Sequence, residues 1–356
     1  MSRRFWSDQV AGLEPYVPGE QPRGSGVLKL NTNESPYPPS PRVLEALSSI
    51  SGEDLLRYPD PQATALREAL ADAHGLAPEQ VFVGNGSDEV LAHVFFALFR
   101  RPGRLLFPDI SYSFYPVWAQ LYAIDYSRVP LREDFRIAVE DYDEAASSVI
   151  LPNPNAPTGR LLALEEIRAF LDAGPDRLLV VDEAYIDYGG ESAIALLGEY
   201  DNLLVIQTLS KSRALAGLRV GLAFGSAELI DALVRVKDSF NSYPVDVVAQ
   251  RAALAAVRDP AWYDDCSRRV IRNREALRAS LTELGFEVVP SSANFLFVRH
   301  PGHEGRALFA ALRERGIIVR RWDLPRIDQY LRISVGTEEH IERVGAALAE
   351  IVSPGA

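Results

Sequence analysis

Short, continuous apolar runs recur along the first part of the chain, with helical patterns or turn residues between them. A strand that is buried on both faces is apolar throughout, so these runs are typical of a mostly parallel sheet covered by helices on both sides. They predict strands over residues 81–83, 104–107, 148–151, 177–181 and 202–207. The segment 88–99 predicts a helix directly after the first of these strands.

The pattern changes near residue 255. Residues 262–284 predict one long helix that ends at Gly285, and residues 338–352 predict a final helix. Strand-like segments between these helices predict a smaller α+β unit; they cover residues 286–290, 294–299, 316–320 and 330–335. We therefore expect an N-terminal arm that also contributes to the small domain, a large domain and a small C-terminal domain, over residues 1–41, 42–254 and 255–356.

Composition narrows the classes of function. The net charge is −12 and no long basic run offsets it, which argues against nucleic acid as a partner. No apolar stretch is long enough to span a membrane, and no apolar segment of a secretory signal follows Arg3 and Arg4. The single cysteine, Cys266, forms no internal disulfide, so we expect a cytoplasmic protein. The pair His300 and His303 predicts a surface turn, and we expect no metal site.

Lysine is rare in this chain. Of the 37 basic residues only three are lysine, namely Lys29, Lys211 and Lys237. Arginine stays protonated and cannot serve as an amine nucleophile, whereas lysine can. A retained lysine therefore suggests amine chemistry, and a purely structural lysine is the alternative.

A first candidate motif is VFVGNGSDEV, residues 81–90. A strand, a glycine turn and a helix start follow one another here, and the free N–H groups of a helix start bind phosphate. The alternative is an ordinary turn with Ser87 or Asp88 as the N-cap. The motif is not a dinucleotide fingerprint, because Gly84-x-Gly86 lacks the third glycine, and it is not a Walker A loop.

A second candidate is Asp182, just past a predicted buried strand in LVVDEAYIDY. Ligands of open α/β sheets bind at this edge, and a carboxylate there could keep a ring nitrogen protonated. Tyr185 would lie near it if the following turn is helical. A turn or helix cap is the alternative role for Asp182.

A third candidate is Lys211, which follows the next strand in TLSKSRALAGLRVG. Ser210 and Ser212 flank it and Arg219 lies further on, a set that suits a phosphate as well as an aldehyde. A surface lysine is the alternative. A phosphate seat, a carboxylate for a ring nitrogen and a lysine that can form a Schiff base together match the needs of pyridoxal 5′-phosphate (PLP).

These segments resemble the fold-type I, class I/II aminotransferases, and within them the histidinol-phosphate aminotransferase family. The similarity covers nearly the whole chain and lies in residues 15–19 (PYVPG), 30–36 (LNTNESP), 57–59 (RYP), 84–90, 154–159 (PNAPTG), 182–185 (DEAY), 210–212 (SKS) and 331–337 (LRISVGT). The resemblance implies a PLP-dependent transferase with a large, mostly parallel α/β domain and a smaller α+β C-terminal domain.

The resemblance also implies the roles of individual residues. Cofactor-binding positions are Gly86, Ser87, Asp88, Tyr112, Asn155, Asp182, Tyr185, Ser210, Lys211 and Arg219, with Tyr58 supplied by a partner subunit. Among these, Lys211 holds PLP as a Schiff base and then acts as general base, while Asp182 pairs with the ring nitrogen and Tyr185 with the phenolic oxygen. Substrate-binding positions are Tyr16, Asn33, Arg320 and Arg332, with Arg320 for a phosphate and Arg332 for a carboxylate.

One departure from the family pattern concerns the residue before Pro-Thr-Gly, which is usually an asparagine that meets the phenolic oxygen. Here that residue is Ala156, and Asn155 precedes it. We expect a small shift of the loop to let Asn155 take the role.

The expected reaction is PLP-dependent transamination of L-histidinol phosphate with 2-oxoglutarate in histidine biosynthesis, by a homodimer with shared active sites. Three alternatives stay open. An aromatic aminotransferase would share every cofactor residue, and Trp322 could favour a ring substrate. A threonine-phosphate decarboxylase would use the same fold, and a catalytically inactive regulatory module is the non-enzyme alternative.

Overall fold

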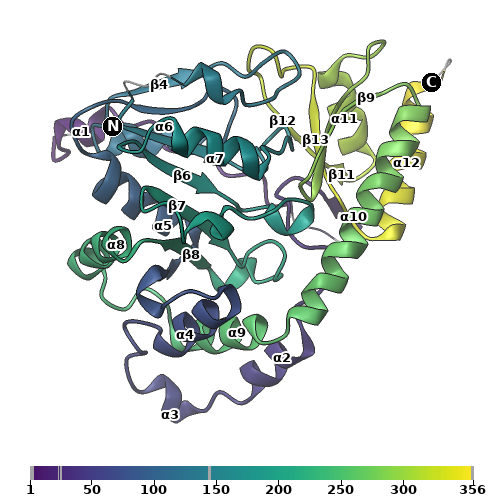
Figure 1. The fold of residues 1–356 in the computed structure, drawn as a ribbon. Helices are drawn as coiled ribbons and strands as arrows, with labels where there is room; N and C mark the ends of the chain where they lie inside the picture. Colours follow the sequence, from purple (N-terminus) through teal and green to yellow (C-terminus); the bar gives the residue numbers. More distant parts are fainter. Residues whose placement is uncertain (1–3, 23, 25, 143–145, 354–356) are drawn as a thin grey trace.

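The computed structural model describes residues 4–22, 24, 26–142 and 146–353 (Figure 1). Its largest sheet has seven strands in the order β2-β8-β7-β6-β5-β3-β4. Every neighbouring pair is parallel except the two pairs made by β8. The strands are β2 (Val81–Asn85), β3 (Leu105–Pro108), β4 (Tyr126–Val129), β5 (Ser148–Pro152), β6 (Leu178–Asp182), β7 (Leu203–Thr208) and β8 (Val220–Gly225). The expected α/β class with a mostly parallel sheet is confirmed.

Both faces of this sheet are buried, which explains why its strands are apolar throughout. In β6, Leu179 and Val181 pack into one core cluster, and Leu178 and Val180 pack into the other. One face is covered by α2 (Pro41–Ser48), α4 (Thr64–His74), α7 (Leu164–Asp172) and α9 (Val247–Val257). The other is covered by α5 (Gly86–Val94), α6 (Tyr115–Leu121) and α8 (Ala227–Phe240).

The expected helix over 88–99 starts earlier than predicted and is not α-helical to its end at Phe99. The α-helix begins at Gly86, and a π-helical turn, Phe95–Phe99, replaces its last part. A π turn is wider than an α turn, and here it accommodates the buried rings of Phe95 and Phe99, whose centroids lie 5.0 Å apart.

A second, antiparallel sheet has four strands in the order β12-β13-β10-β9. They are β9 (Glu287–Val289), β10 (Phe295–Arg299), β12 (Arg320–Arg321) and β13 (Leu331–Ser334). Three helices pack with this sheet in one core; they are α10 (Pro260–Glu283), α11 (Gly305–Glu314) and α12 (Glu338–Val352). In Figure 1, α10 extends from the large sheet to this second sheet and runs beside α12.

The single strand expected over 316–320 is wrong, because the chain changes partner at Val319. The part before it, β11 (Ile317–Ile318), pairs in parallel with β1 (Leu28–Lys29) of the N-terminal arm. The part after it, β12, pairs with β13. This exchange brings the arm beside the C-terminal part of the chain and places residues 31–34 at the carboxyl edge of the large sheet.

The remaining short elements connect these layers. The helices α1 (Asp8–Ala11) and α3 (Gly52–Leu55) lie in the N-terminal part, and 3-10 turns occupy Pro78–Gln80, Val139–Asp141, Ile186–Tyr188, Ala193–Leu196 and Ala216–Leu218. Within the described residues, none of the helices is both long and apolar enough to cross a membrane.

Candidate active site

A cavity of about 410 Å³ lies at the carboxyl ends of the parallel strands. Twelve of the residues predicted from the sequence line it: Tyr16, Asn33, Ser87, Asp88, Tyr112, Asp182, Tyr185, Ser210, Lys211, Arg219, Arg320 and Arg332. Segments that lie far apart in the sequence thus meet in one place. Gly86, Asn155 and Tyr58 do not line it.

The start of α5 forms an open seat at one end of the cavity. Its N-cap is Asn85, which makes no side-chain cap, so neither Ser87 nor Asp88 has the capping role considered above. The first N–H groups of the helix are therefore free to bind an anion. Close approach requires glycine here, since a Cβ on Gly221 would lie 2.3 Å from the backbone of Gly86 and Ser87.

Arg219 reaches over this seat. A Cβ on Gly86, whose φ is +79°, would lie 2.5 Å from Arg219 Nη2. The same nitrogen lies 2.9 Å from Asp88 Oδ2, and the Tyr112 hydroxyl donates to Asp88 Oδ1 at 2.8 Å. Burial, with the nearby Asp88 charge, holds the pKa of Tyr112 well above its usual value, so its hydroxyl stays a donor. Asp88 therefore orients both the guanidinium and the ring.

Asp182 is the last residue of β6 and is almost fully buried. The Tyr115 hydroxyl donates to its Oδ2 at 2.7 Å, whereas Oδ1 has no hydrogen-bond partner among the described residues. Burial raises the pKa of Asp182 to about 6, although the hydrogen bond from Tyr115 opposes the shift. A buried carboxylate with one free oxygen fits a cationic donor in the cavity.

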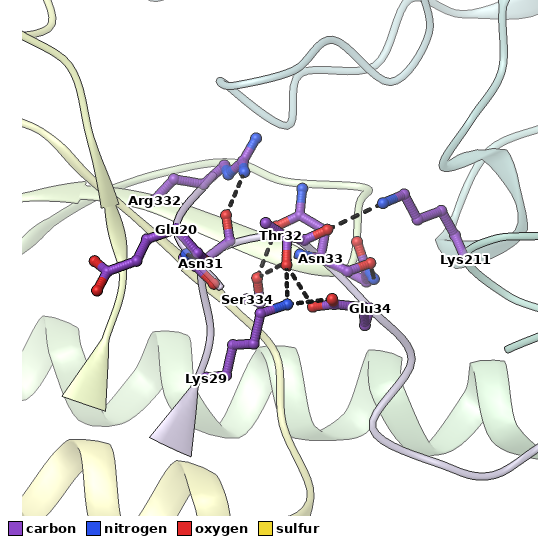
Figure 2. A network of polar contacts seen from close by, with 10 residues as sticks. Glu20, Lys29, Asn31, Thr32, Asn33, Glu34, Lys211, Arg332 and Ser334 are labelled. Carbon is purple, nitrogen blue, oxygen red and sulfur yellow. Dashed lines mark hydrogen bonds and ion pairs between the residues drawn. The ribbon is translucent and has the colours of Figure 1, made fainter. Parts of the chain in front are cut away.

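Lys211 follows β7 and points into the cavity. Its Nζ donates to the carbonyl oxygen of Thr32 at 3.0 Å, as Figure 2 shows, and lies 5.8 Å from the centre of the Tyr185 ring. The Tyr185 hydroxyl accepts a hydrogen bond of 3.1 Å from Asn33 Nδ2. The amine and the phenol thus face the same space and are both held by the N-terminal arm.

Two arginines face each other across β12 and β13, where Arg320 is in register with Arg332. Arg332 Nη2 donates to the Asn31 carbonyl at 2.9 Å, but its Nε has no partner among the described residues. Burial lowers the pKa of Arg332, and the charge of Arg320 acts in the same direction. The side chain of Arg320 makes no hydrogen bond or ion pair within the described part of the chain. Like charges in register are unfavourable, so this pair favours an anion between them.

Aromatic rings complete the cavity around this pair. The Trp322 ring centre lies 5.6 Å from the Arg320 guanidinium and 5.2 Å from that of Arg332. Tyr16 also lines the cavity and stacks on Phe114 with 4.7 Å between ring centroids. The site therefore offers flat apolar surfaces beside two cations.

The contact expected from Asn155 is not found. Its side chain is fully buried, and Nδ2 donates to Ile110 O at 3.0 Å and to Thr158 Oγ1 at 2.9 Å. These bonds use the amide to fix its own loop, so the expected shift toward the cavity does not occur. The polar partner of Tyr185 is Asn33 instead.

Tyr58 lies on the surface, away from the cavity of its own chain. It is 81% exposed and stacks on Tyr243 with 4.7 Å between centroids. Sequence reasoning had assigned its role to a partner subunit, and the position on the surface leaves Tyr58 accessible to a partner.

Three contributors were missed from the sequence: Tyr115, Thr32 and Asn31. Tyr115 lies 67 residues before Asp182, and Thr32 lies 179 residues before Lys211. Asn31 and Thr32 lie in the LNTNESP motif, but no local pattern indicates which of its carbonyls meets which side chain.

The fold and the cavity together define an α/β enzyme with a lysine amine, a buried carboxylate and paired guanidinium groups at one sheet edge. The family model for aminotransferase class I and II matches residues 25–348. Histidinol-phosphate aminotransferase 2 of Dechloromonas aromatica is 56% identical over 98% of this chain and 99% of its own length. Histidinol-phosphate aminotransferase 1 of Bradyrhizobium diazoefficiens is 57% identical over 98% and 99%. The chain belongs to the class I and II aminotransferases.

Solved structures agree on the fold. Histidinol-phosphate aminotransferase from Sinorhizobium meliloti, in complex with pyridoxal-5′-phosphate, superposes with a TM-score of 0.86 at 24% identity and covers 99% of this chain and 98% of its own. L-threonine-O-3-phosphate decarboxylase from Porphyromonas gingivalis superposes with a TM-score of 0.81 at 24% identity, covering 92% and 99%. Because a transaminase and a decarboxylase share the fold, the reaction has to be argued from the site.

Proposed function

We propose that this chain transfers the amino group of L-histidinol phosphate to 2-oxoglutarate, giving imidazole-acetol phosphate and glutamate in histidine biosynthesis, with PLP as cofactor. The observation that carries the substrate is the pair Arg320 and Arg332, which face each other in register without an acidic partner among the described residues. The names of relatives at 56–57% identity support the same assignment.

The cavity residues fit PLP. The free oxygen of Asp182 suits a protonated ring nitrogen, and the glycine cradle beneath Arg219 suits a phosphate. We assign the cofactor phosphate to Gly86, Ser87, Ser210 and Arg219. Tyr112 would cover the face of the cofactor ring, Asp182 would pair with the ring nitrogen and Tyr185 with the phenolic oxygen. When bound, PLP supplies an electron sink conjugated to the substrate amine.

The residues of the chain carry out the proton transfers and the positioning. Lys211 would hold the cofactor through Nζ, and the same nitrogen, once free, would carry the proton from the substrate Cα to the C4′ carbon of the cofactor. Asp182, being buried, stabilises a cation beside its free oxygen more strongly than an exposed carboxylate would. Asn33 fixes the hydroxyl of Tyr185, so that this donor is already oriented before a ligand arrives.

The two arginines serve different half-reactions. Histidinol phosphate carries a phosphate and no carboxylate, whereas glutamate carries carboxylates and no phosphate. We assign the phosphate of histidinol phosphate to Arg320 and the carboxylate of glutamate to Arg332. A guanidinium binds either group through two parallel hydrogen bonds, which gives orientation as well as charge.

Product analysis tests this assignment. Histidinol phosphate, histidinol, phenylalanine and threonine phosphate are supplied separately with 2-oxoglutarate, and the products are identified. Glutamate formed from histidinol phosphate far faster than from histidinol is the expected result. Equal rates with and without the phosphate would overturn phosphate recognition. The aromatic walls at Trp322 and Tyr16 make an aromatic aminotransferase the second candidate, which phenylalanine turnover would identify.

We also propose a homodimer in which Tyr58 reaches the partner's phosphate seat. Tyr58 stacks on Tyr243, and both are exposed large apolar side chains, as are Leu55 and Leu56 nearby in the sequence, which favours a second copy as their cover. Mixing Tyr58→Ala subunits with Lys211→Ala subunits should restore part of the activity, because one site of the hybrid receives both intact residues. Sedimentation as a monomer at assay concentration would contradict the shared site.

A division into an arm (1–41), a large domain (42–254) and a small domain (255–356) is part of the same proposal. It is supported by a core cluster made only of residues from the arm and from the C-terminal part, although Phe297 and Tyr330 also pack into a core of the large sheet. Limited proteolysis that cuts first near residue 255 would agree with this division.

A further inference from the structure

Three consecutive residues of the N-terminal arm, 31–33, each contact a different functional group of the cavity (Figure 2). The first carbonyl accepts from Arg332 at 2.9 Å, and the second accepts from Lys211 at 3.0 Å. The side chain of Asn33 donates to Tyr185 at 3.1 Å. A small displacement of this segment would therefore disturb the substrate anchor, the amine and the phenol together.

Lys29 holds this segment from outside the cavity. It lies on β1, which β11 anchors, and its Nζ both donates to the Thr32 hydroxyl and pairs with the Glu34 carboxylate. The Thr32 hydroxyl donates to the other oxygen of Glu34. In Figure 2 these contacts close a small polar ring next to the Lys211 amine.

Glu34 and Thr32 of this ring both line the cavity together with Lys211, and Glu34 is the one that carries a charge. Burial opposes its ionisation, but hydrogen bonds from Lys29 and Thr32, and the charges of Lys29 and Lys211, hold the pKa of Glu34 below its usual value. An ionised carboxylate thus lies within the electrostatic reach of the amine. A lysine held as an ammonium ion by a carboxylate is neither a nucleophile nor a base.

We propose that Lys29 is a positioning residue that neutralises Glu34 and holds it away from Lys211. The Lys211 amine then keeps the neutral carbonyl of Thr32 as its partner and stays available for reaction. This inference rests on the proposed function, because it takes Lys211 as the reacting amine.

The test compares Lys29→Met with the double variant Lys29→Met/Glu34→Gln. Because the chain has only three lysines, trace acetylation of the cofactor-free full chain followed by peptide mass mapping reads each one separately. In Lys29→Met, Glu34 turns to Lys211, and acetylation of Lys211 falls roughly threefold to tenfold. Removing the Glu34 charge in the same chain restores the rate. Buried Lys237, which donates to Pro61 O, reports any general opening of the fold and stays unchanged.

Turnover of the loaded enzyme gives the second readout. In Lys29→Met, kcat falls by a similar factor with little change in KM. Lys29→Arg keeps the positive charge and therefore retains most of the wild-type kcat. The matched control is Arg313→Met, which breaks the exposed Glu20–Arg313 pair of the same arm and leaves kcat unchanged.

The outcomes separate this inference from the proposed function. Equal rises in the acetylation rates of Lys211 and Lys237 in Lys29→Met would mean that Lys29 has a purely structural role, and would overturn the inference. An unchanged acetylation rate of Lys211 would also overturn it, as would a failure of Glu34→Gln to restore that rate. The acetylation is read without turnover, whereas wild-type product analysis tests the proposed function alone.

Discussion

Asp182→Asn should change the pH dependence of stability of the cofactor-free protein while it removes most of the turnover. Burial raises the pKa of Asp182 from 3.8 to about 6, so the carboxyl group binds its proton more tightly in the folded protein than in the unfolded chain. Its contribution to stability is therefore complete below the unfolded value and is lost as the pH rises through about 6. The asparagine side chain of the variant does not titrate, so the variant loses no stability at this position as the pH rises.

The magnitude follows from the shift. About two pKa units at 1.36 kcal/mol each make the full loss about 3 kcal/mol. At about pH 5 the group lies roughly one unit below its folded pKa, so about 1.4 kcal/mol is still to be lost by about pH 8. An unpaired amide group in the variant adds a cost that does not depend on pH and cancels in the comparison. Glu183, whose pKa burial raises to about 7, titrates in both proteins and cancels as well.

The assay is urea unfolding of the cofactor-free proteins at about pH 5 and about pH 8, at one protein concentration because subunit association shifts stability. Between the two conditions, wild type should lose about 1.4 kcal/mol more than Asp182→Asn. With PLP bound, a cationic ring nitrogen beside the carboxylate should remove this extra loss. Equal losses in the two cofactor-free proteins would refute the reasoning, and turnover of the variant within about twofold of wild type would refute the role of the charge.

Three further predictions concern the cavity. Arg320→Ala should lower kcat/KM for histidinol phosphate more than for glutamate, and Arg332→Ala should do the reverse. Each loss should be about tenfold to a hundredfold, because a charge-assisted hydrogen bond contributes roughly 1.5–3 kcal/mol. Equal effects on both substrates would contradict the assignment of one substrate group to each arginine. Gly221→Ala should weaken PLP binding in an absorbance titration by roughly tenfold or more, because the new Cβ would lie 2.3 Å from the backbone of Gly86 and Ser87. The control is Gly198→Ala, whose Cβ would have no other group within 4 Å and which should bind PLP normally. Tyr115→Phe should lower kcat about fivefold with KM unchanged, since it removes one bond of about 1 kcal/mol to Asp182, and a changed KM alone would argue against it.

The strands and helices that the sequence predicted well are those whose environment is uniform along their length. Strands β5, β6 and β7 are buried on both faces, so their apolar runs mark them, and α12 was predicted with its observed bounds because one of its faces is buried and its cap is Thr337. Strand β8 was missed. Its sequence, VGLAFG, carries glycines at 221 and 225, which weaken a strand pattern although Gly221 is needed for close approach at the phosphate seat.

Strand β4 was missed for a different reason. It is an edge strand that is only partly buried, and its sequence, YSRV, has no continuous apolar run. The exchange of partners at Val319 was also invisible, because the residues on both sides of it are compatible with one strand and only the tertiary structure assigns them to different sheets.

The features of the site also fall into two groups, those that the sequence could predict and those that it could not. Lys211, Asp182 and Arg219 lie in motifs that follow strands, so their meeting at one sheet edge could be expected from the order of the chain. Contacts between distant segments could not be. The bond from Tyr115 to Asp182 depends on how helix α6 packs on β6, and nothing local to either residue signals it. The side chain of Asn155 bonds to Ile110 and Thr158 and does not line the cavity, because a residue one position from a motif need not point the same way.

The cavity holds charged groups whose protein partners are incomplete, and this feature links its energetics to its function. Asp182 keeps one free oxygen, Arg332 one free nitrogen, and Arg320 faces a like charge. Each arrangement lowers the stability of the empty fold, because buried polar atoms are costly when unpaired and like charges repel. Each also matches one charge of the proposed ligands: a cationic ring nitrogen, a carboxylate and a phosphate. Ligands that complete these partners should therefore stabilise the protein in proportion to how many they complete, so that PLP with a phosphate-bearing substrate protects it from unfolding more than PLP alone.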